Sequence, residues 1–252
     1  MGNAGTQAAG LWAFIHDDAD SQQGVTGASD IVLEKQGIGE AMSNSVSPSS
    51  LTDGLGHRWG VLETSLKFHA SCRHTHPGAD AFLLLLENEK LDIEDIVCVS
   101  VGVHQGALDA LNYSVAPNTI SEAKFSMGCV LGLLAHYGTA GVEAFTPDTI
   151  RNPQVCDFAK CVSMVLDPEV DAAYPQKWIG KVAVTTRDQR VIERRLEYPK
   201  GDPQNPLSSE ERLAKFHRLA SLGSLREPDA IIDWAETLSQ RGSVGSLMQW
   251  LR

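Results

Sequence analysis

The sequence has few of the features that would place a protein in a membrane or on nucleic acid. It contains no apolar run near the ~20 residues that a bilayer span requires, and its longest compact run extends only from Phe82 to Leu86. Basic residues are also scarce, since 21 Lys and Arg stand against 32 Asp and Glu, a formal net charge of −11. A general nucleic-acid binder carries charge of the opposite sign. We therefore expect neither a membrane nor a nucleic-acid partner.

Cysteine is infrequent and its pattern is irregular. The five cysteines are Cys72, Cys98, Cys129, Cys156 and Cys161. An odd number at irregular spacing, with no recognisable secretory signal, predicts reduced thiols and an intracellular, cytoplasmic protein. With 252 residues, of which 42% are hydrophobic and 21% charged, the chain has the composition and length of one large globular domain or two small ones.

Hydrophobic periodicity and capping signals predict mixed helices and strands. We expect, in chain order, a buried helix over 4–15, loops with one short helix over 17–56, a strand over 59–68, a helix from His76-Pro77, a strand over 96–104, a helix over 121–136, a helix from Asn152-Pro153 to about 162, a hairpin over 179–197 and helices after Ser208. Ser208 and Glu211 have the spacing of a capping box. This order predicts an α+β fold with three segments, 1–56, 57–206 and 207–252.

The densest group of chemically active side chains lies in residues 67–77, directly before the helix expected from His76. It holds Lys67, Arg73, His74 and His76. Helix N-termini attract anions, arginine forms bidentate contacts with carboxylates, and Lys and His can move protons. We expect Lys67, Arg73 and His76 to form a corner that binds a carboxylate, with His74 beside it.

Two other interpretations of this segment remain open. It could be a solvated polar loop with a structural histidine. It could also be a zinc site, because His69, Cys72, His74 and His76 have suitable ligand atoms. However, no second ligand pair has finger-like spacing, and Arg73 would place a cation beside the metal.

Two further motifs carry weaker signals. In residues 198–206, Gly201 would permit a tight turn beside a ligand and Lys200 could pair with a substrate carboxylate. The alternative is a rigid linker from sheet to helix. Residues 121–126 alone indicate only the start of a capped helix, since Glu122 and Lys124 do not share a helix face.

Taken in order, four stretches resemble the MmgE/PrpD family, which includes 2-methylcitrate dehydratase, cis-aconitate decarboxylase and iminodisuccinate epimerase. They are Gly5-Thr-Gln-Ala-Ala-Gly-Leu-Trp12, the run from Leu66 to Pro77 with Asp80 following, Glu122-Ala-Lys-Phe-Ser126, and Tyr198-Pro-Lys-Gly-Asp-Pro203. The resemblance implies a small α/β domain flanked by parts of a large all-helical domain, with the active site in the cleft. It also implies a cofactor-free, usually dimeric lyase or isomerase of small polycarboxylates, in which Lys67 lines the site and Arg73 and His76 belong to the same motif.

Two departures from the family pattern bear on activity. Family members are about twice as long, so the chain corresponds to their C-terminal half and would lack the catalytic Asp and His segments. A Lys-x-x-His helix usually follows the Gly-Leu-Trp motif, whereas here Asp17-Asp-Ala-Asp20 runs directly into Ser21. We therefore expect either a truncated lyase of the 2-methylcitrate dehydratase type or a non-catalytic remnant that binds anions or partners a full-length relative. A mitochondrial location would follow if the protein were eukaryotic and a preceding segment carried a transit peptide.

Overall fold

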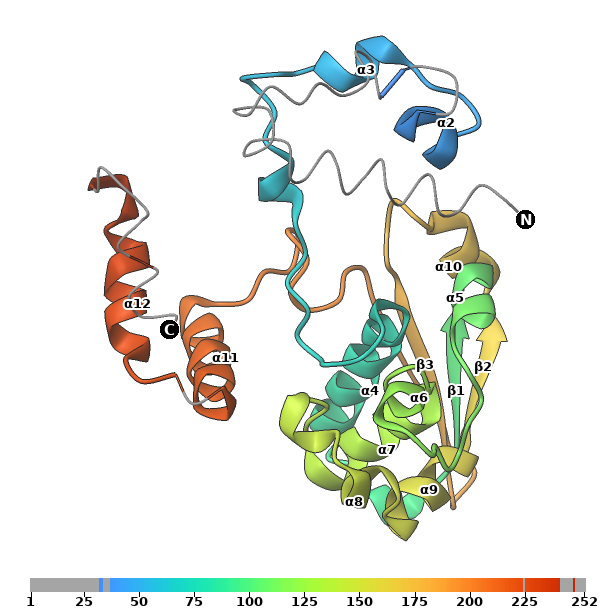
Figure 1. Cartoon of the computed structure of the whole chain (residues 1–252). Coiled ribbons are helices and arrows are strands. Elements are labelled where there is room, and N and C mark those ends of the chain that lie inside the picture. Colours follow the sequence, from blue (N-terminus) through green and yellow to red (C-terminus); the bar gives the residue numbers. More distant parts are fainter. Residues whose placement is uncertain (1–31, 34–36, 224, 241–246, 248–252) are drawn as a thin grey trace. The chain divides into compact units, whose positions relative to one another are not determined.

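A computed structural model describes residues 32–33, 37–223, 225–240 and 247. The chain divides into two compact units, Met1–Gly60 and Val61–Arg252, each of which is described by itself (Figure 1). The helix expected over 4–15 lies outside the described residues. In the first unit, where one short helix was expected, the described part contains two, α2 (Ile38–Met42) and α3 (Pro48–Thr52), and neither has a buried residue.

The second unit is built on a four-stranded mixed sheet in the order β2-β1-β3-β4. The strands are β1 (Ile96–Val103), β2 (Val162–Leu166), β3 (Gly180–Thr186) and β4 (Val191–Leu196). β1 pairs in parallel with β2 and antiparallel with β3, and β3 and β4 form the expected hairpin. Val99, Val101 and Val103 alternate along β1 and point into the core. Val97 would continue this alternation, but a register shift between Ile96 and Cys98 leaves it 48% exposed.

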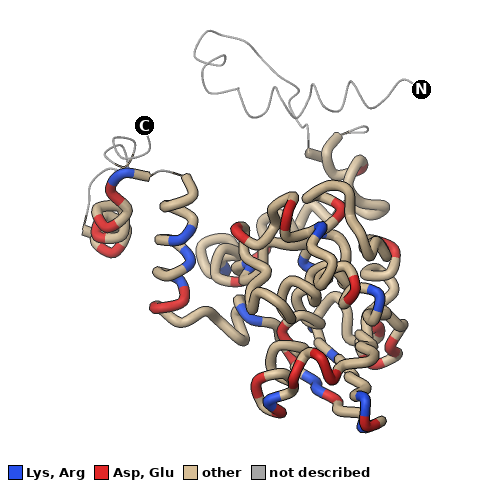
Figure 2. The backbone as a smooth tube through the Cα atoms, turned by 90° about the horizontal axis from the view of Figure 1, so that it is seen from below, with Lys and Arg blue, Asp and Glu red and all other residues tan. Residues whose placement is uncertain are grey.

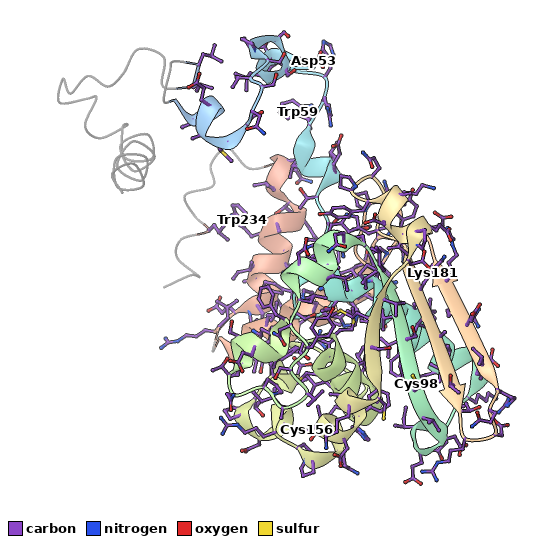
Figure 3. The ribbon with its side chains drawn as sticks, turned by 90° about the vertical axis from the view of Figure 1, so that its right-hand side faces the viewer. Asp53, Trp59, Cys98, Cys156, Lys181 and Trp234 are labelled. Carbon is purple, nitrogen blue, oxygen red and sulfur yellow. The ribbon has the colours of Figure 1, made fainter. Side chains whose placement is uncertain are left out.

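Two helices cover the core face of this sheet (Figure 1). They are α4 (His76–Glu89) and α7 (Met127–Tyr137), and α9 (Pro153–Lys160) packs against α7. A side chain on Gly132 of α7 would lie 2.8 Å from the carbonyl oxygen of Val155 on α9, so the close approach of these helices requires glycine. Figure 3 shows the labelled Cys98 and Lys181 on the neighbouring strands β1 and β3.

Short elements connect the strands and helices. They are the 3₁₀ turns η1 (Gly60–Glu63), η2 (Arg73–Thr75), η3 (Ile93–Asp95) and η4 (Val142–Ala144), and the helices α5 (Gln105–Ala110), α6 (Ile120–Lys124), α8 (Pro147–Ile150) and α10 (Pro168–Ala173). The prediction of a strand over 59–68 is wrong, because this stretch contains η1 and irregular chain. The helix predicted over 121–136 is two helices. α6 ends with Phe125 as its C-cap, and Ser126 caps α7 by accepting a hydrogen bond from the Cys129 N–H.

The described C-terminal part is helical. It comprises α11 (Ser209–Leu222), α12 (Pro228–Glu236) and the 3₁₀ turn η5 (Leu238–Gln240). The predicted capping box is confirmed. The Ser208 hydroxyl accepts from the Glu211 N–H at 3.1 Å, and the Glu211 carboxylate accepts from the Ser208 N–H at 2.7 Å. The α+β fold class is confirmed as well.

Candidate functional site

The segment from Leu66 to Cys72 is held in place by backbone hydrogen bonds to three separate parts of the unit. The bonds run from Leu66 N–H to the Gly201 carbonyl, from Ala70 N–H to the Ala140 carbonyl, and from Cys72 N–H to the Lys124 carbonyl, each at 2.8 Å. These partners belong to the 198–206 loop, the loop after α7 and the end of α6. The segment therefore has a fixed path although it has no regular secondary structure.

Gly201 makes the first of these bonds possible. Its φ angle is +93°, which L-residues rarely adopt, and a Cβ atom there would lie 1.9 Å from the Leu66 carbonyl oxygen. The sequence predicts a tight turn beside a ligand at this glycine. In the structure, the turn approaches the backbone of the 66–72 segment and holds it beside the candidate site.

A pocket of about 430 Å³ opens beside this segment. Its lining residues come from the segment, α6, η4 and α11: Lys67, His69, Ala70, Ser71, Cys72, Lys124, Phe125, Val142, Lys215 and Leu219. Three of them are lysines and none is Asp or Glu, although the whole chain carries an excess of acidic residues. Figure 2 shows acidic and basic residues interspersed along the rest of the backbone. The pocket is therefore a local concentration of positive charge that suits an anionic ligand.

Each lysine is oriented by a different local contact. The ammonium group of Lys67 donates to the Ser71 carbonyl at 3.1 Å. That of Lys124 lies 5.5 Å from the ring centroid of Phe145. Burial lowers the pKa of Lys215, and the nearby Arg218 cation lowers it further, while Glu143 opposes both. The three cations thus reach the same pocket from separate elements.

One lining residue, His69, pairs with a buried carboxylate behind the pocket wall. His69 is 2% exposed, and its Nε2 lies 2.8 Å from Oδ1 of Asp80. The other carboxylate oxygen of Asp80 accepts a hydrogen bond from the Lys200 backbone N–H at 2.6 Å. Asp80 therefore joins α4, the 66–72 segment and the 198–206 loop.

Arg73 does not line the pocket. Its guanidinium group forms an ion pair with the Asp202 carboxylate and lies 5.1 Å from the ring centroid of Trp178. The Ser65 hydroxyl donates to the same Asp202 oxygen at 2.5 Å. Burial lowers the pKa of Arg73, and the carboxylates of Asp202 and Asp80 oppose that shift. The arginine therefore links its own segment to the 198–206 loop.

His74 belongs to an aromatic cluster on the same side as Arg73. Its Nδ1 lies 3.1 Å from Nε2 of His104, and the His104 ring stacks on Tyr174 with centroids 3.7 Å apart. Burial lowers the pKa of His74, and Arg73 lowers it further. Burial also lowers the pKa of His104 to about 4, with His74 adding to the effect. Both rings therefore favour the neutral form.

His76 is completely buried at the start of α4. Neither ring nitrogen makes a hydrogen bond of ordinary geometry within the described residues. Burial lowers its pKa to about 2, and His69 and Arg73 add to the shift, which a contact with the Ser71 backbone only partly opposes. Its backbone N–H donates to the Arg73 carbonyl in η2, so it is not available to an anion. Of the corner expected from Lys67, Arg73 and His76, only Lys67 lines the pocket.

The Lys200 side chain also points elsewhere. Its ammonium group pairs with the Glu211 carboxylate at 2.9 Å, which joins the 198–206 loop to the first turn of α11. Sequence reasoning did not identify Asp80, Lys124 or Lys215 as site residues. Lys124 lay within a quoted motif, but no local pattern connected Lys215 with the segment 148 positions before it.

The four candidate zinc ligands do not converge. The His69 ring pairs with Asp80 and the His74 ring with His104, while His76 makes neither contact. Within the part of the chain that the structure describes, no group of three or more His, Cys, Asp or Glu side chains could hold a metal ion. A search of those same residues finds no helix that is both long and apolar enough to cross a membrane.

The fold and the pocket together define an α+β domain with a lysine-lined pocket. The sequence model of the MmgE/PrpD C-terminal domain matches residues 69–238. The chain belongs to the MmgE/PrpD family, to whose C-terminal domain these residues correspond. No curated protein sequence matches the chain significantly.

Proposed function

We propose that the pocket lined by Lys67, Lys124 and Lys215 binds the carboxylates of a small polycarboxylic acid. The observation that carries this proposal is the presence of three lysines and no acidic residue around one pocket, in a chain of net charge −11. The family supports a reaction class for the site, which is a cofactor-free lyase of the 2-methylcitrate dehydratase type. Such a reaction begins with removal of a proton next to a carboxylate.

The lysines would stabilise the charge that this step creates. Removing a proton beside a carboxylate puts a second negative charge onto the carboxylate oxygens, and fixed cations around those oxygens lower the barrier. We assign Lys67 the catalytic position at the reacting carboxylate, because the Ser71 carbonyl holds its ammonium group at the pocket wall. Arg73, His74, His76 and Lys200 hold the surrounding segments in place, through the contacts already described, and act on the substrate indirectly.

Calorimetric titration of the purified chain with citrate tests the proposal. We expect a Kd near the millimolar range, about −4 kcal/mol, because the pocket is open and water weakens each ion pair. Lys67→Gln, Lys124→Gln and Lys215→Gln should each weaken binding roughly three- to tenfold. Lys90→Gln is the matched control, since Lys90 is exposed at the end of α4 and does not line the pocket. Equal affinity in all four variants would overturn the proposal.

We also propose that the protein is a cytoplasmic homodimer, as the family resemblance implies. Two observations support this. Leu213 and Leu222 on α11 are 38% and 55% exposed, and each offers an apolar contact to a second copy of the chain. The five cysteines are free, as expected in a reducing compartment. Light scattering should give twice the monomer mass for the native chain and a shift towards monomer for a Leu213→Gln, Leu222→Gln double variant.

A further inference from the structure

His69 lines the pocket and pairs with Asp80, and the proposed function does not yet use this pair. Histidine beside a carboxylate is a common proton carrier, because the carboxylate fixes the ring and stabilises its charged form. Here the pair is buried, whereas the lysines of the pocket are long side chains that supply positive charge. The pair therefore offers chemistry that the lysines do not.

The hydrogen bonds determine which nitrogen of His69 can act as a base. One carboxylate oxygen of Asp80 accepts a hydrogen bond from the Lys200 N–H, and the other lies beside Nε2 of His69. An ionised carboxylate only accepts hydrogen bonds, so we assign the hydrogen of the bond between His69 and Asp80 to Nε2. In the neutral ring the lone pair is then on Nδ1, for which the described residues provide no hydrogen-bond partner.

Aromatic rings and cationic side chains surround the His69 ring. Phe68 and His76 contact the ring edge to face, with centroids 5.1 and 5.2 Å away. Lys67, Lys124 and Lys215 line the same pocket as His69. A bound polycarboxylate would offset those cations, which leaves Asp80 to stabilise the imidazolium that forms.

We propose that His69 is the catalytic base of the lysine pocket, which takes a proton from the carbon next to a substrate carboxylate, and that Asp80 is its positioning residue. This inference rests on the proposed function. The C–H bond breaks and an N–H bond forms at Nδ1. The electron pair of the broken bond moves into the carboxylate, whose oxygens the lysines surround. Return of a proton from solvent to the same carbon reverses the step without any co-reactant.

Exchange of carbon-bound hydrogen in heavy water tests this step directly. Tricarballylate is a suitable probe, since it has three carboxylates and no leaving group that could end the reaction by elimination. The full chain is incubated with it in D₂O, and loss of the carbon-bound hydrogen signals is followed by proton NMR. Binding of the same probe is measured by calorimetry, so that affinity and proton transfer are separated.

We expect exchange by the native chain and a loss of about 100-fold or more in His69→Gln, within the range for general-base catalysis. Affinity should change less than about threefold, because the lysines remain. Asp80→Asn should also slow exchange at similar affinity, since an amide cannot accept from both His69 and Lys200. His136→Gln is the matched control and should exchange at the native rate, because His136 is on α7 and does not line the pocket.

The possible failures are distinguishable. If the native chain does not bind tricarballylate, both the proposed function and this inference fail. If it binds but shows no exchange, or if His69→Gln exchanges at the native rate, only the inference fails. Nitrogen-15 NMR of the unmodified chain adds a test that needs no variant to fold. Nε2 should carry the hydrogen and Nδ1 should be bare, and the opposite tautomer would overturn the assignment.

Discussion

At the residue scale, the position of the lysine pocket depends on Gly201. Its backbone has a φ of +93°, and its missing side chain lets the Leu66 carbonyl come close. Any side chain at this position would meet the backbone of the segment that carries Lys67 and His69. The glycine therefore connects a local conformational requirement to the geometry of the site.

Replacing Gly201 should destabilise the fold more than replacing a glycine that also has a positive φ but has no close neighbour. Gly201→Ala should lower the free energy of unfolding by about 3 kcal/mol or more, because it adds a backbone clash to the strain. Gly138→Ala is the control, since Gly138 has a φ of +68° with nothing within 4 Å, and should cost only about 1 kcal/mol. Urea unfolding of both variants measures the difference, and equal losses would show that the clash is relieved.

Because His76 is buried, the free energy of unfolding should depend on pH. Its folded-state pKa of about 2 lies below the ordinary value of 6.5, so the unfolded chain binds the proton more tightly. The stabilisation is fully present above about pH 6.5 and is lost as the pH falls, at about 1.4 kcal/mol per pH unit. Urea unfolding at about pH 7 and about pH 5 should therefore show a loss roughly 2 kcal/mol larger for the native chain than for His76→Leu. Identical losses would mean that His76 is not neutral in the fold.

Residue identities alone predicted some of these roles and not others. The turn at Gly201 and the cap at Ser208 follow from local conformational rules. The roles of Arg73 and His76 do not, because they depend on Asp202 and on complete burial. Lys215 was missed since its place in the pocket arises only when α11 packs beside η4.

At the element scale, α11 is the least secured contributor to the pocket. Of its residues only Ala220 is buried, yet it supplies Lys215 and Leu219 to the lining. Its first turn is held by the Ser208–Glu211 capping box and by the ion pair between Lys200 and Glu211. Further along the helix, Arg218 pairs with Glu143 of η4 at 3.4 Å. With so little buried surface, α11 depends on these polar contacts to stay in place.

Removing the cap should loosen this helix and weaken the site together. Ser208→Ala should cost about 1 kcal/mol and increase amide exchange across α11, while affinity for citrate falls. Ser221→Ala, an exposed position at the other end of α11, serves as the control and should leave both unchanged. Mass-spectrometric hydrogen exchange measures the helix and calorimetry measures the affinity. Faster exchange without any loss of affinity would contradict the role of α11 in the pocket.

Elements with strong local signals were predicted correctly, and those shaped by tertiary contacts were not. The β3–β4 hairpin and the start of α4 follow from alternation and from proline at a helix start. β2 was missed, because five residues between α9 and α10 become a strand only by pairing with β1. The predicted strand over 59–68 failed because mixed apolar and polar residues indicate little without a pairing partner.

At the scale of the whole molecule, the central feature is a contrast of charge. The chain has a formal charge of −11, while one pocket gathers three lysines. Such a contrast directs an anion to one location, and added salt should weaken the effect. The family membership and the pocket thus support the same class of ligand by independent routes.

The most direct test follows the lysine side chains themselves. In protein labelled with carbon-13 at lysine, the Cε–Hε signals of Lys67, Lys124 and Lys215 should shift together as citrate is added. Their shifts should fit one dissociation constant near the millimolar range, at about −4 kcal/mol, while Lys90 and Lys160, which lie outside the pocket lining, stay unchanged. Uniform small shifts of all lysines, or none at the three pocket lysines, would contradict the claim that this pocket binds polycarboxylates.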